Sequence, residues 1–191
     1  MKRIKSIKNI ILLGYLIIGF TSCDFLDRSD PDKLNKNDFY KTENDMYQAL
    51  NAAYDGLKTN YYNNMYYWTE IRSDNTTLAS KTANSGIYND FDVYNLTSSN
   101  AEVQRAWYGM FTCVHRSNVV LDYIDNVPMD DEKKSQYKAE ARFLRALSYY
   151  NLSQLFGDVP IVDKQLSSEA EVLKYGRRPI AEVYDFIVKD L

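Results

Sequence analysis

The sequence predicts an all-α fold built from antiparallel helix pairs that are joined by long irregular loops. Several segments repeat apolar side chains at three- and four-residue steps, which is the spacing of one face of an α-helix. Glycine and proline follow these segments where helices should end: Gly157 and Pro160 follow the longest one, and Pro128 follows the one before it. A short piece at 159–162 is predicted to be extended.

The first 22 residues have the layout of a secretory signal peptide. Residues 1–9 carry four basic side chains and no acidic one, and residues 10–20 form an apolar run of 11, too short to span a bilayer. Small residues then precede Cys23, which suits a bacterial lipoprotein signal whose cysteine is acylated. Phe20 departs from the aliphatic residue usual three positions before that cysteine, and a secretory signal without lipid is the alternative.

Removal of residues 1–22 would change the net charge from −3 to −7, because the segment holds Lys2, Arg3, Lys5 and Lys8 and no acid. An acidic chain is a poor partner for nucleic acid and for anionic lipid. Several acyl chains on Cys23 would nevertheless hold the protein firmly on a membrane, since a single chain binds only marginally.

Residues 23–36 are polar and acidic and are predicted to form a tether, followed by a helical domain at 37–191. Pro179 suits the first turn of a last helix. The apolar stripe of that helix is expected to consist of Ile180, Val183, Ile187 and Leu191. Because the sequence stops within this stripe, we expect the domain to be truncated at its C-terminal end, with Ile187 and Leu191 lacking their partners.

Four further helical segments are expected. The first follows Thr42 and Asp45, a weak capping box, and a second is predicted for Tyr61 to Ile71. The apolar positions of the first helix are Met46, Ala49, Leu50, Ala53, Tyr54 and Leu57. Residues 73–100 are rich in Ser, Thr and Asn and are predicted to be irregular; a connection this long is usually functional or mobile.

A third helix is predicted for Ala101 to Asn126 and a fourth from Asp130 or Asp131 to Gly157. The third has an apolar face made of Trp107, Phe111, Val114, Asn118, Leu121 and Ile124. The fourth has one made of Ala141, Leu144, Leu147 or Ser148, Tyr150 or Asn151, and Leu155. Residues 163–178 connect it to the last helix.

The sequence offers no constellation for catalysis. His115 is the single histidine, so no histidine-based zinc cluster can form, and we expect a structural role for it. Cys113 is left alone once Cys23 is acylated, which excludes a disulfide and makes it a small core residue. Phosphate-binding glycine loops and serine nucleophile elbows are missing. We therefore expect no enzyme, no metal and no cofactor. The Glu140, Arg142 and Arg145 cluster is expected to be a solvated face or a capping network.

Aromatic and amide side chains are unusually dense in residues 61–68, and a long Asn/Thr-rich segment that contains Tyr88 follows them. The chain has 17 tyrosines, and residues 61–68 hold five tyrosine or tryptophan side chains. Sugar rings are bound by an aromatic plate together with planar polar groups. Trp68 stands four residues before Arg72, so the two are expected to share one helical face. The candidate ligand-binding residues are Trp68, Arg72, Asp74, Asn75 and Tyr88. The alternative is that these aromatic rings only pack helices together.

Residues 138–162 read KAEARFLRALSYYNLSQLFGDVPIV and closely resemble the signature of the SusD/RagB family. The segment at 178–191, RPIAEVYDFIVKDL, resembles the family sequence expected after that signature, and the acidic start at Asp24 to Asp27 is also typical. The resemblance covers roughly residues 23–191 and implies a TPR-like helical scaffold.

The resemblance also implies a function. Members of the family are nutrient-binding lipoproteins of the outer membrane, so we expect a protein that captures an oligosaccharide on the cell exterior. Its partner would be a SusC-like TonB-dependent transporter. A RagB-like protein that binds peptides and a helical interaction module of the periplasm are the alternatives. A secreted hydrolase is disfavoured by the missing catalytic constellation.

Overall fold

The computed structural model describes residues 39–79 and 86–191, and Tyr40–Leu191 form one compact unit. The predicted signal peptide, the tether and Cys23 lie outside the described residues. The long helices of the unit are α2 (Glu43–Thr59), α4 (Ala101–Tyr123), α5 (Asp131–Phe156) and α7 (Ile180–Asp190). Among the described residues no strand is present beyond an isolated bridge of Val159 to Arg178. The all-α prediction is confirmed.

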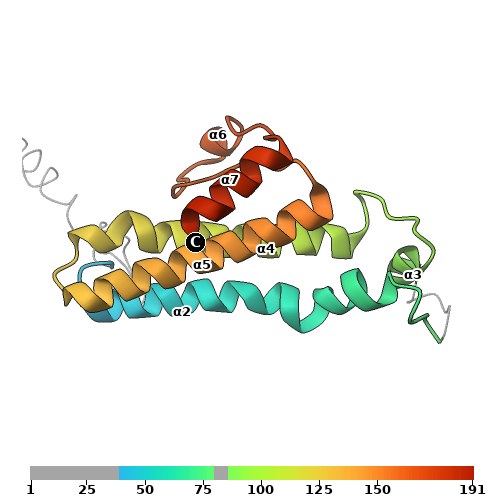
Figure 1. The fold of residues 1–191 in the computed structure, drawn as a ribbon, viewed down its shortest axis with the longest axis horizontal. Coiled ribbons are helices and arrows are strands. Elements are labelled where there is room, and N and C mark those ends of the chain that lie inside the picture. Colours follow the sequence, from blue (N-terminus) through green and yellow to red (C-terminus); the bar gives the residue numbers. More distant parts are fainter. Residues whose placement is uncertain (1–38, 80–85) are drawn as a thin grey trace, which may run out of the picture. The chain divides into compact units, whose positions relative to one another are not determined.

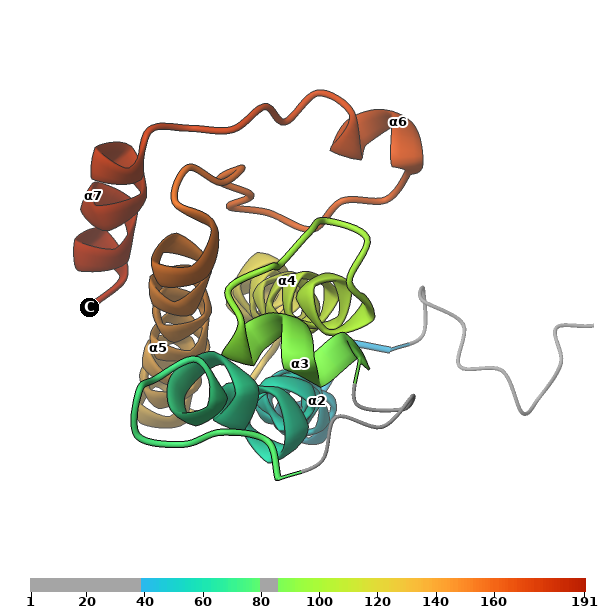
Figure 2. The same cartoon turned by 90° about the vertical axis from the view of Figure 1, so that its right-hand side faces the viewer.

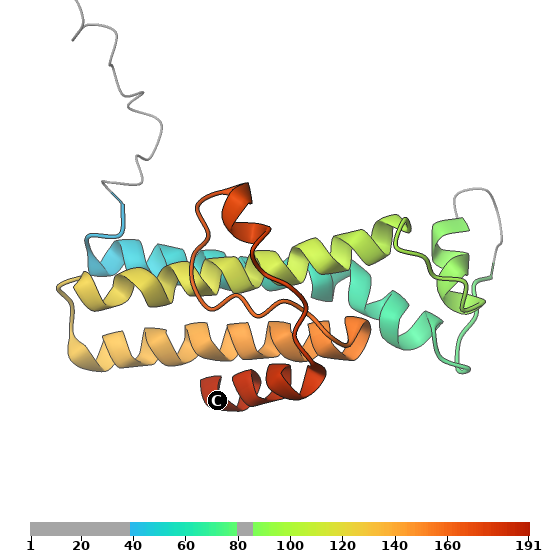
Figure 3. The same ribbon diagram turned by 90° about the horizontal axis from the view of Figure 1, so that it is seen from above.

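Successive long helices run in opposite directions (Figure 1). Helix α4 packs against both α2 and α5, and α7 packs on α5. The view from above shows α5 between α4 and α7 (Figure 3). The segment between α5 and α7 crosses over α4, forms the short helix α6 (Glu169–Val172) and returns (Figure 2). We call its first part, residues 158–166, the strap.

The helix ends follow the sequence signals. Thr42 and Asp45 form a reciprocal capping box: the Asp45 amide donates to Thr42 Oγ1 at 3.2 Å, and the Thr42 amide donates to Asp45 Oδ2 at 2.9 Å. Asp130 caps α5 by accepting the amide of Lys133 at 3.0 Å. Gly157 ends α5 with a φ of 68°, a conformation that glycine adopts without steric strain.

Helices α2 and α4 cross closely at Gly56, because a Cβ atom there would lie 2.8 Å from the Cα atom of Cys113.

Two apolar clusters form the core. One cluster, between α2, α4 and the first half of α5, contains Met46, Leu50, Cys113, Val120, Ile124 and Leu144. The other contains Trp68, Phe91, Met110, Tyr149, Leu152 and Ile187. Both clusters include residues of α4 and α5, so these two helices form the centre of the unit.

The prediction of a separate second helix at 61–71 is wrong. The chain stays helical from Glu43 to Ile71 and passes through two π-helical segments, η2 (Asn60–Asn64) and η3 (Tyr67–Ile71). No glycine or proline lies between Leu57 and Tyr61, where the two predicted helices would separate, so nothing in the sequence breaks the helix there. Each π-helical segment widens the helix and changes which side chains share a face.

The prediction that residues 73–100 are irregular is wrong in part. Residues Gly86–Asp92 form the helix α3, while 73–79 and 93–99 lack regular structure. Phe91 is the buried residue of α3 and belongs to the second core cluster. The burial of this ring explains why so short a helix is held in place.

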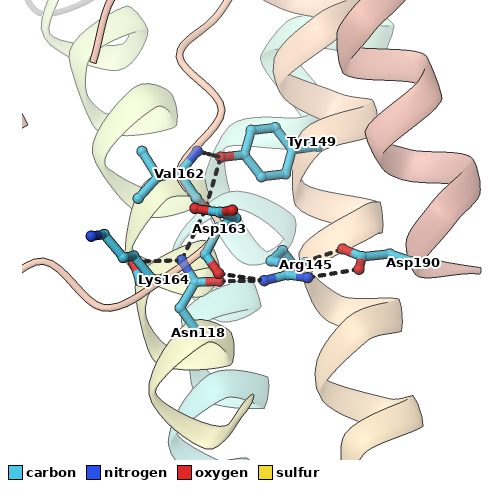
Figure 4. A network of polar contacts seen from close by, with 7 residues as sticks. All are labelled: Asn118, Arg145, Tyr149, Val162, Asp163, Lys164 and Asp190. Atoms are coloured by element: carbon cyan, nitrogen blue, oxygen red, sulfur yellow. Dashed lines mark hydrogen bonds and ion pairs between the residues drawn. The ribbon is translucent and has the colours of Figure 1, made fainter. Parts of the chain in front are cut away.

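The prediction that Arg145 lies on a solvated face is also wrong, because its guanidinium is buried at the centre of a polar network (Figure 4). Arg145 makes a bidentate ion pair with Asp190 of α7, with both N···O distances at 2.7 Å. Its Nη1 atom also donates to Asn118 Oδ1 at 2.7 Å and to the Asp163 carbonyl at 3.1 Å. The ring of Phe186 lies 4.9 Å from the guanidinium carbon. Neighbouring Arg142 is exposed.

The same network holds the strap on the helices. Asn118 Nδ2 donates to the carbonyls of Val162 and Lys164 at 2.9 and 3.0 Å, and the Tyr149 hydroxyl accepts the amide of Val162 at 2.7 Å. Burial raises the pKa of Tyr149 well above its usual value. The strap therefore has a fixed position, although it lacks regular secondary structure.

The apolar stripes of the last two helices differ in detail from those predicted. In α5 the buried face runs through Ala141, Leu144, Ser148 and Leu152, while Leu147 is half-buried. In α7, Val183 and Ile187 are buried, so the expectation that Ile187 lacks partners is wrong. Leu191 is 77% exposed, as expected.

Candidate functional site

Most of the predicted ligand-binding residues lie at one end of the unit. There η3, the turn after it, α3 and the start of α4 come together, at the right of Figure 1. We call this surface the tyrosine-rich end. It is defined by Tyr66, Tyr67, Arg72, Asp74, Asn75, Tyr88 and Tyr94.

The centre of the tyrosine-rich end is a stack of two rings. The ring centroids of Tyr67 and Tyr88 lie 4.4 Å apart, and the two rings are inclined by 18°. The ring of Tyr66 meets that of Tyr67 edge-on, with 6.0 Å between their centroids. Burial and the hydrogen bond to Tyr88 raise the pKa of Tyr67 to about 12, and the negative charge of Glu102 adds to this rise. The shift extends the pH range over which the Tyr67 hydroxyl keeps its proton, although an ordinary tyrosine is also neutral at physiological pH.

Tyr94 is presented by an unusual backbone conformation. Its φ is 56°, in the left-handed region that residues other than glycine rarely adopt, and its hydroxyl donates to the carbonyl of Arg72. The ring is nonetheless 63% exposed. A tyrosine whose hydroxyl is anchored and whose face is free has little rotamer freedom to lose when a flat ligand stacks on it.

Arg72, Asp74 and Asn75 are exposed and lie in the turn that follows η3. The Ser73 hydroxyl donates to the Glu70 carbonyl at 2.7 Å and accepts the amide of Asn75 at 3.3 Å. These bonds fix the backbone of the turn but leave the three polar side chains pointing to solvent.

Trp68 differs from the other predicted site residues because it is buried, with 8% of its surface exposed. Its ring meets Phe91 edge-on at 5.0 Å and Phe156 at 6.0 Å. Trp68 and Arg72 do not present one shared surface as expected, because Trp68 is buried in the core while Arg72, just after the end of η3, is exposed. A contribution of Trp68 to ligand binding stays a prediction.

A charged pair lies at the base of the tyrosine-rich end. Arg105 Nη1 and Glu102 Oε1 are 2.6 Å apart, and the Glu102 side chain is buried. Its second oxygen has no hydrogen-bond partner among the described residues. Sequence reasoning missed Tyr66, Tyr67, Tyr94 and Glu102; only the aromatic density between positions 61 and 94 could have indicated the tyrosines.

The structure also shows a groove that the sequence did not reveal. It lies between α4 and the segment after α5 and has a volume of about 340 Å³. Its walls are almost entirely apolar, and it is lined by Trp107, Tyr108, Phe111, Pro160, Val162, Leu166 and Val172, with His115 at its edge. The groove lining includes hydroxyl, indole and imidazole groups but no carboxylate, amide or guanidinium side chain, so the tyrosine-rich end suits a sugar better than this groove.

The described residues offer no site for metal or for nucleophilic catalysis. They contain no group of three or more His, Cys, Asp or Glu side chains placed to hold a metal ion. Cys113 is buried, donates to the Ala53 carbonyl at 3.4 Å and has its pKa raised by burial, so the thiolate is disfavoured. Within this part of the chain, no helix combines the length and the apolar character needed to cross a membrane.

The fold and the sequence together define the class of the protein. The model of the SusD-like family described as "Starch-binding associating with outer membrane" matches residues 24–191. The chain therefore belongs to the SusD-like family, and its TPR-like helical scaffold is that of the family.

Relatives with names agree with this assignment. The chain is 28% identical over 193 residues to SusD-like protein P38 of Formosa agariphila. The match covers 100% of this chain and 37% of that protein. A solved laminarin binding SusD-like protein superposes with a TM-score of 0.71 at 25% identity, covering 79% of this chain and 33% of that one. Surface glycan-binding protein A from Bacteroides uniformis superposes with a TM-score of 0.68 at 25% identity. This match covers 78% of the present chain and 33% of that protein. The chain thus spans about a third of the length of these relatives.

Proposed function

We propose that the protein binds an oligosaccharide at the tyrosine-rich end and does not cleave it. The observation that carries the proposal is the combination, on one surface, of free aromatic faces with planar polar groups. Tyr66 and Tyr94, which are 53% and 63% exposed, supply the aromatic faces beside the stacked Tyr88, and Arg72, Asp74 and Asn75 supply the polar groups. Aromatic faces stack on the C–H patches of a sugar ring, and amide, carboxylate and guanidinium groups bind its hydroxyls.

Two relatives support the kind of ligand. The names of two of the similar solved proteins refer to laminarin and to surface glycans. Because a scaffold can host many ligands, the identity of the sugar depends on the side chains of the site rather than on the fold.

The place of the protein in the cell follows from its family and its N-terminus. We infer that Cys23 carries the lipid, that the protein is anchored in the outer membrane facing the exterior, and that it delivers its ligand to a SusC-like TonB-dependent transporter. The family description supports association with the outer membrane, and the basic, apolar and small-residue succession before Cys23 supports the anchor.

The lipid anchor is tested by the substitution Cys23→Ala. We expect the variant to lose labelling by a fatty-acid analogue and to leave the membrane fraction, because the acyl chains on Cys23 are the anchor that we infer. Labelling that persists in Cys23→Ala would show that the lipoprotein interpretation is wrong.

Ligand binding is tested on a glycan array and then by titration of the best oligosaccharide. We expect Tyr94→Ala to weaken binding about two- to tenfold, since one stacked ring is worth roughly 0.5–1.5 kcal/mol. Tyr62→Ala is the matched control, because Tyr62 is 79% exposed but lies in η2, outside the site. Equal affinities for the two variants would place the ligand elsewhere.

A further inference from the structure

Acidic side chains outnumber basic ones at the tyrosine-rich end among the described residues. The carboxylates that come from η3, the turn, α3 and the start of α4 are Glu70, Asp74, Asp90, Asp92 and Glu102, and the guanidinium groups are Arg72 and Arg105. Arg105 is paired with Glu102 at 2.6 Å. Among the described residues, four carboxylates therefore remain, against the guanidinium groups of Arg72 and of Arg177, which lines a hollow with Ser98 and Gln104 near the start of α4.

Two of these carboxylates are fixed by neutral donors rather than by cations. Asp92 Oδ2 accepts the Thr77 hydroxyl at 2.9 Å, and Asp90 Oδ2 accepts Asn100 Nδ2 at 3.0 Å. Hydrogen bonds from neutral groups orient a carboxylate and leave its negative charge in place.

Such a surface distinguishes ligands by their charge. An ionised carboxylate only accepts hydrogen bonds, and every hydroxyl of a neutral sugar can donate one. A sulfate or uronate group, in contrast, cannot donate to a carboxylate and is repelled by it, most strongly at low salt. A surface built for anionic sugars would show the opposite balance, with arginine and lysine in excess.

We propose that the tyrosine-rich end takes neutral oligosaccharides and discriminates against those that carry sulfate or carboxylate groups. This inference rests on the proposed function, because it specifies the ligand class of the same site. Arg72 then serves as a hydrogen-bond donor to hydroxyls beside the tyrosine rings, rather than as the centre of an anion site.

The test is a glycan array of matched pairs, in which each neutral oligosaccharide is accompanied by its sulfated or uronate counterpart. The purified protein is applied at low and at high salt. We expect the neutral member of a bound pair to be preferred on the order of tenfold at low salt. The preference should shrink at high salt as the repulsion is screened.

A charge-neutralised variant assigns the preference to the site. Glu70→Gln combined with Asp74→Asn removes two exposed carboxylates from the tyrosine-rich end, and we expect it to reduce the preference several-fold. The matched control is Asp131→Asn with Glu132→Gln, which removes the same charge from the first turn of α5, at the opposite end of the unit (Figure 1). The control should keep the full preference.

The outcomes separate this inference from the proposed function. Binding of the anionic member equally well or better at low salt overturns the discrimination but leaves sugar binding standing. An equal loss of preference in the control variant also overturns it, because net charge rather than the site would then be responsible. Binding of no oligosaccharide at all overturns the proposed function and this inference with it.

Discussion

At the residue scale, neighbouring aromatic side chains have opposite environments. Tyr67 and Trp68 are adjacent in the chain, yet Tyr67 stacks on Tyr88 at the centre of the site while Trp68 is enclosed by Phe91 and Phe156. Tyr66 and Tyr94 are exposed, whereas Trp68 is buried. Stability should therefore depend on Trp68, and affinity on the tyrosines.

This division predicts the effect of Trp68→Ala. We expect the free energy of unfolding to fall by about 3–5 kcal/mol, because a large buried aromatic side chain is lost from a packed cluster. Chemical denaturation measures the change, with exposed Tyr62→Ala as the control. A variant of normal stability that binds its oligosaccharide more weakly would instead assign Trp68 to the ligand.

The sequence could predict which region holds the candidate residues that the structure brings together, but not which of the rings there are exposed. Aromatic density in residues 61–68 and the Asn/Thr-rich segment after them indicated the region, and Arg72, Asp74 and Asn75 are exposed there. The exposure of Trp68 could not be predicted, because π-helical turns change the periodicity on which any assignment of faces depends. Tyr94 was missed because a left-handed tyrosine has no sequence signal.

At the element scale, Arg145 of α5 links three other parts of the chain through polar contacts. It contacts Asn118 of α4, the Asp163 carbonyl of the strap and Asp190 of α7. The strap has no strand partner beyond one bridge, so side-chain bonds take the place of a sheet. Helix α7 gains an ion pair in addition to its apolar contacts with α5.

We expect Arg145→Ala to lower the free energy of unfolding by about 3–5 kcal/mol, since it leaves the buried carboxylate of Asp190 without its partner. Urea denaturation measures this loss. Arg142→Ala is the matched control, because it removes an exposed arginine from the same helix. Equal, small effects of the two variants would mean that the Arg145 side chain is solvated after all.

The difference between Arg142 and Arg145 also shows what a local pattern cannot reveal. Both lie in the signature segment, and helix periodicity alone places neither in the core. Asp190, which decides the environment of Arg145, lies 45 residues further along the chain. The caps at Thr42, Asp130 and Gly157, in contrast, were predictable because each depends on residues within one helical turn.

At the scale of the whole molecule, the helical scaffold and the site have separate origins in the sequence. Helix periodicity and the signature segment determine α4 and α5, around which the other elements pack. The site lies at one end of these helices, where η3, α3 and their loops interrupt the regular packing. Loops on a rigid scaffold are where binding groups are usually displayed.

The central claim is that an oligosaccharide binds to the tyrosine-rich end, and NMR spectroscopy of tyrosine rings tests it most directly. With ¹³C-labelled tyrosine, titration of the best oligosaccharide from the array should shift the ring signals of Tyr66, Tyr88 and Tyr94. The signals of Tyr108 and Tyr175, which line the apolar groove, should stay in place. Shifts confined to Tyr108 and Tyr175 would contradict the account and assign the sugar to the groove.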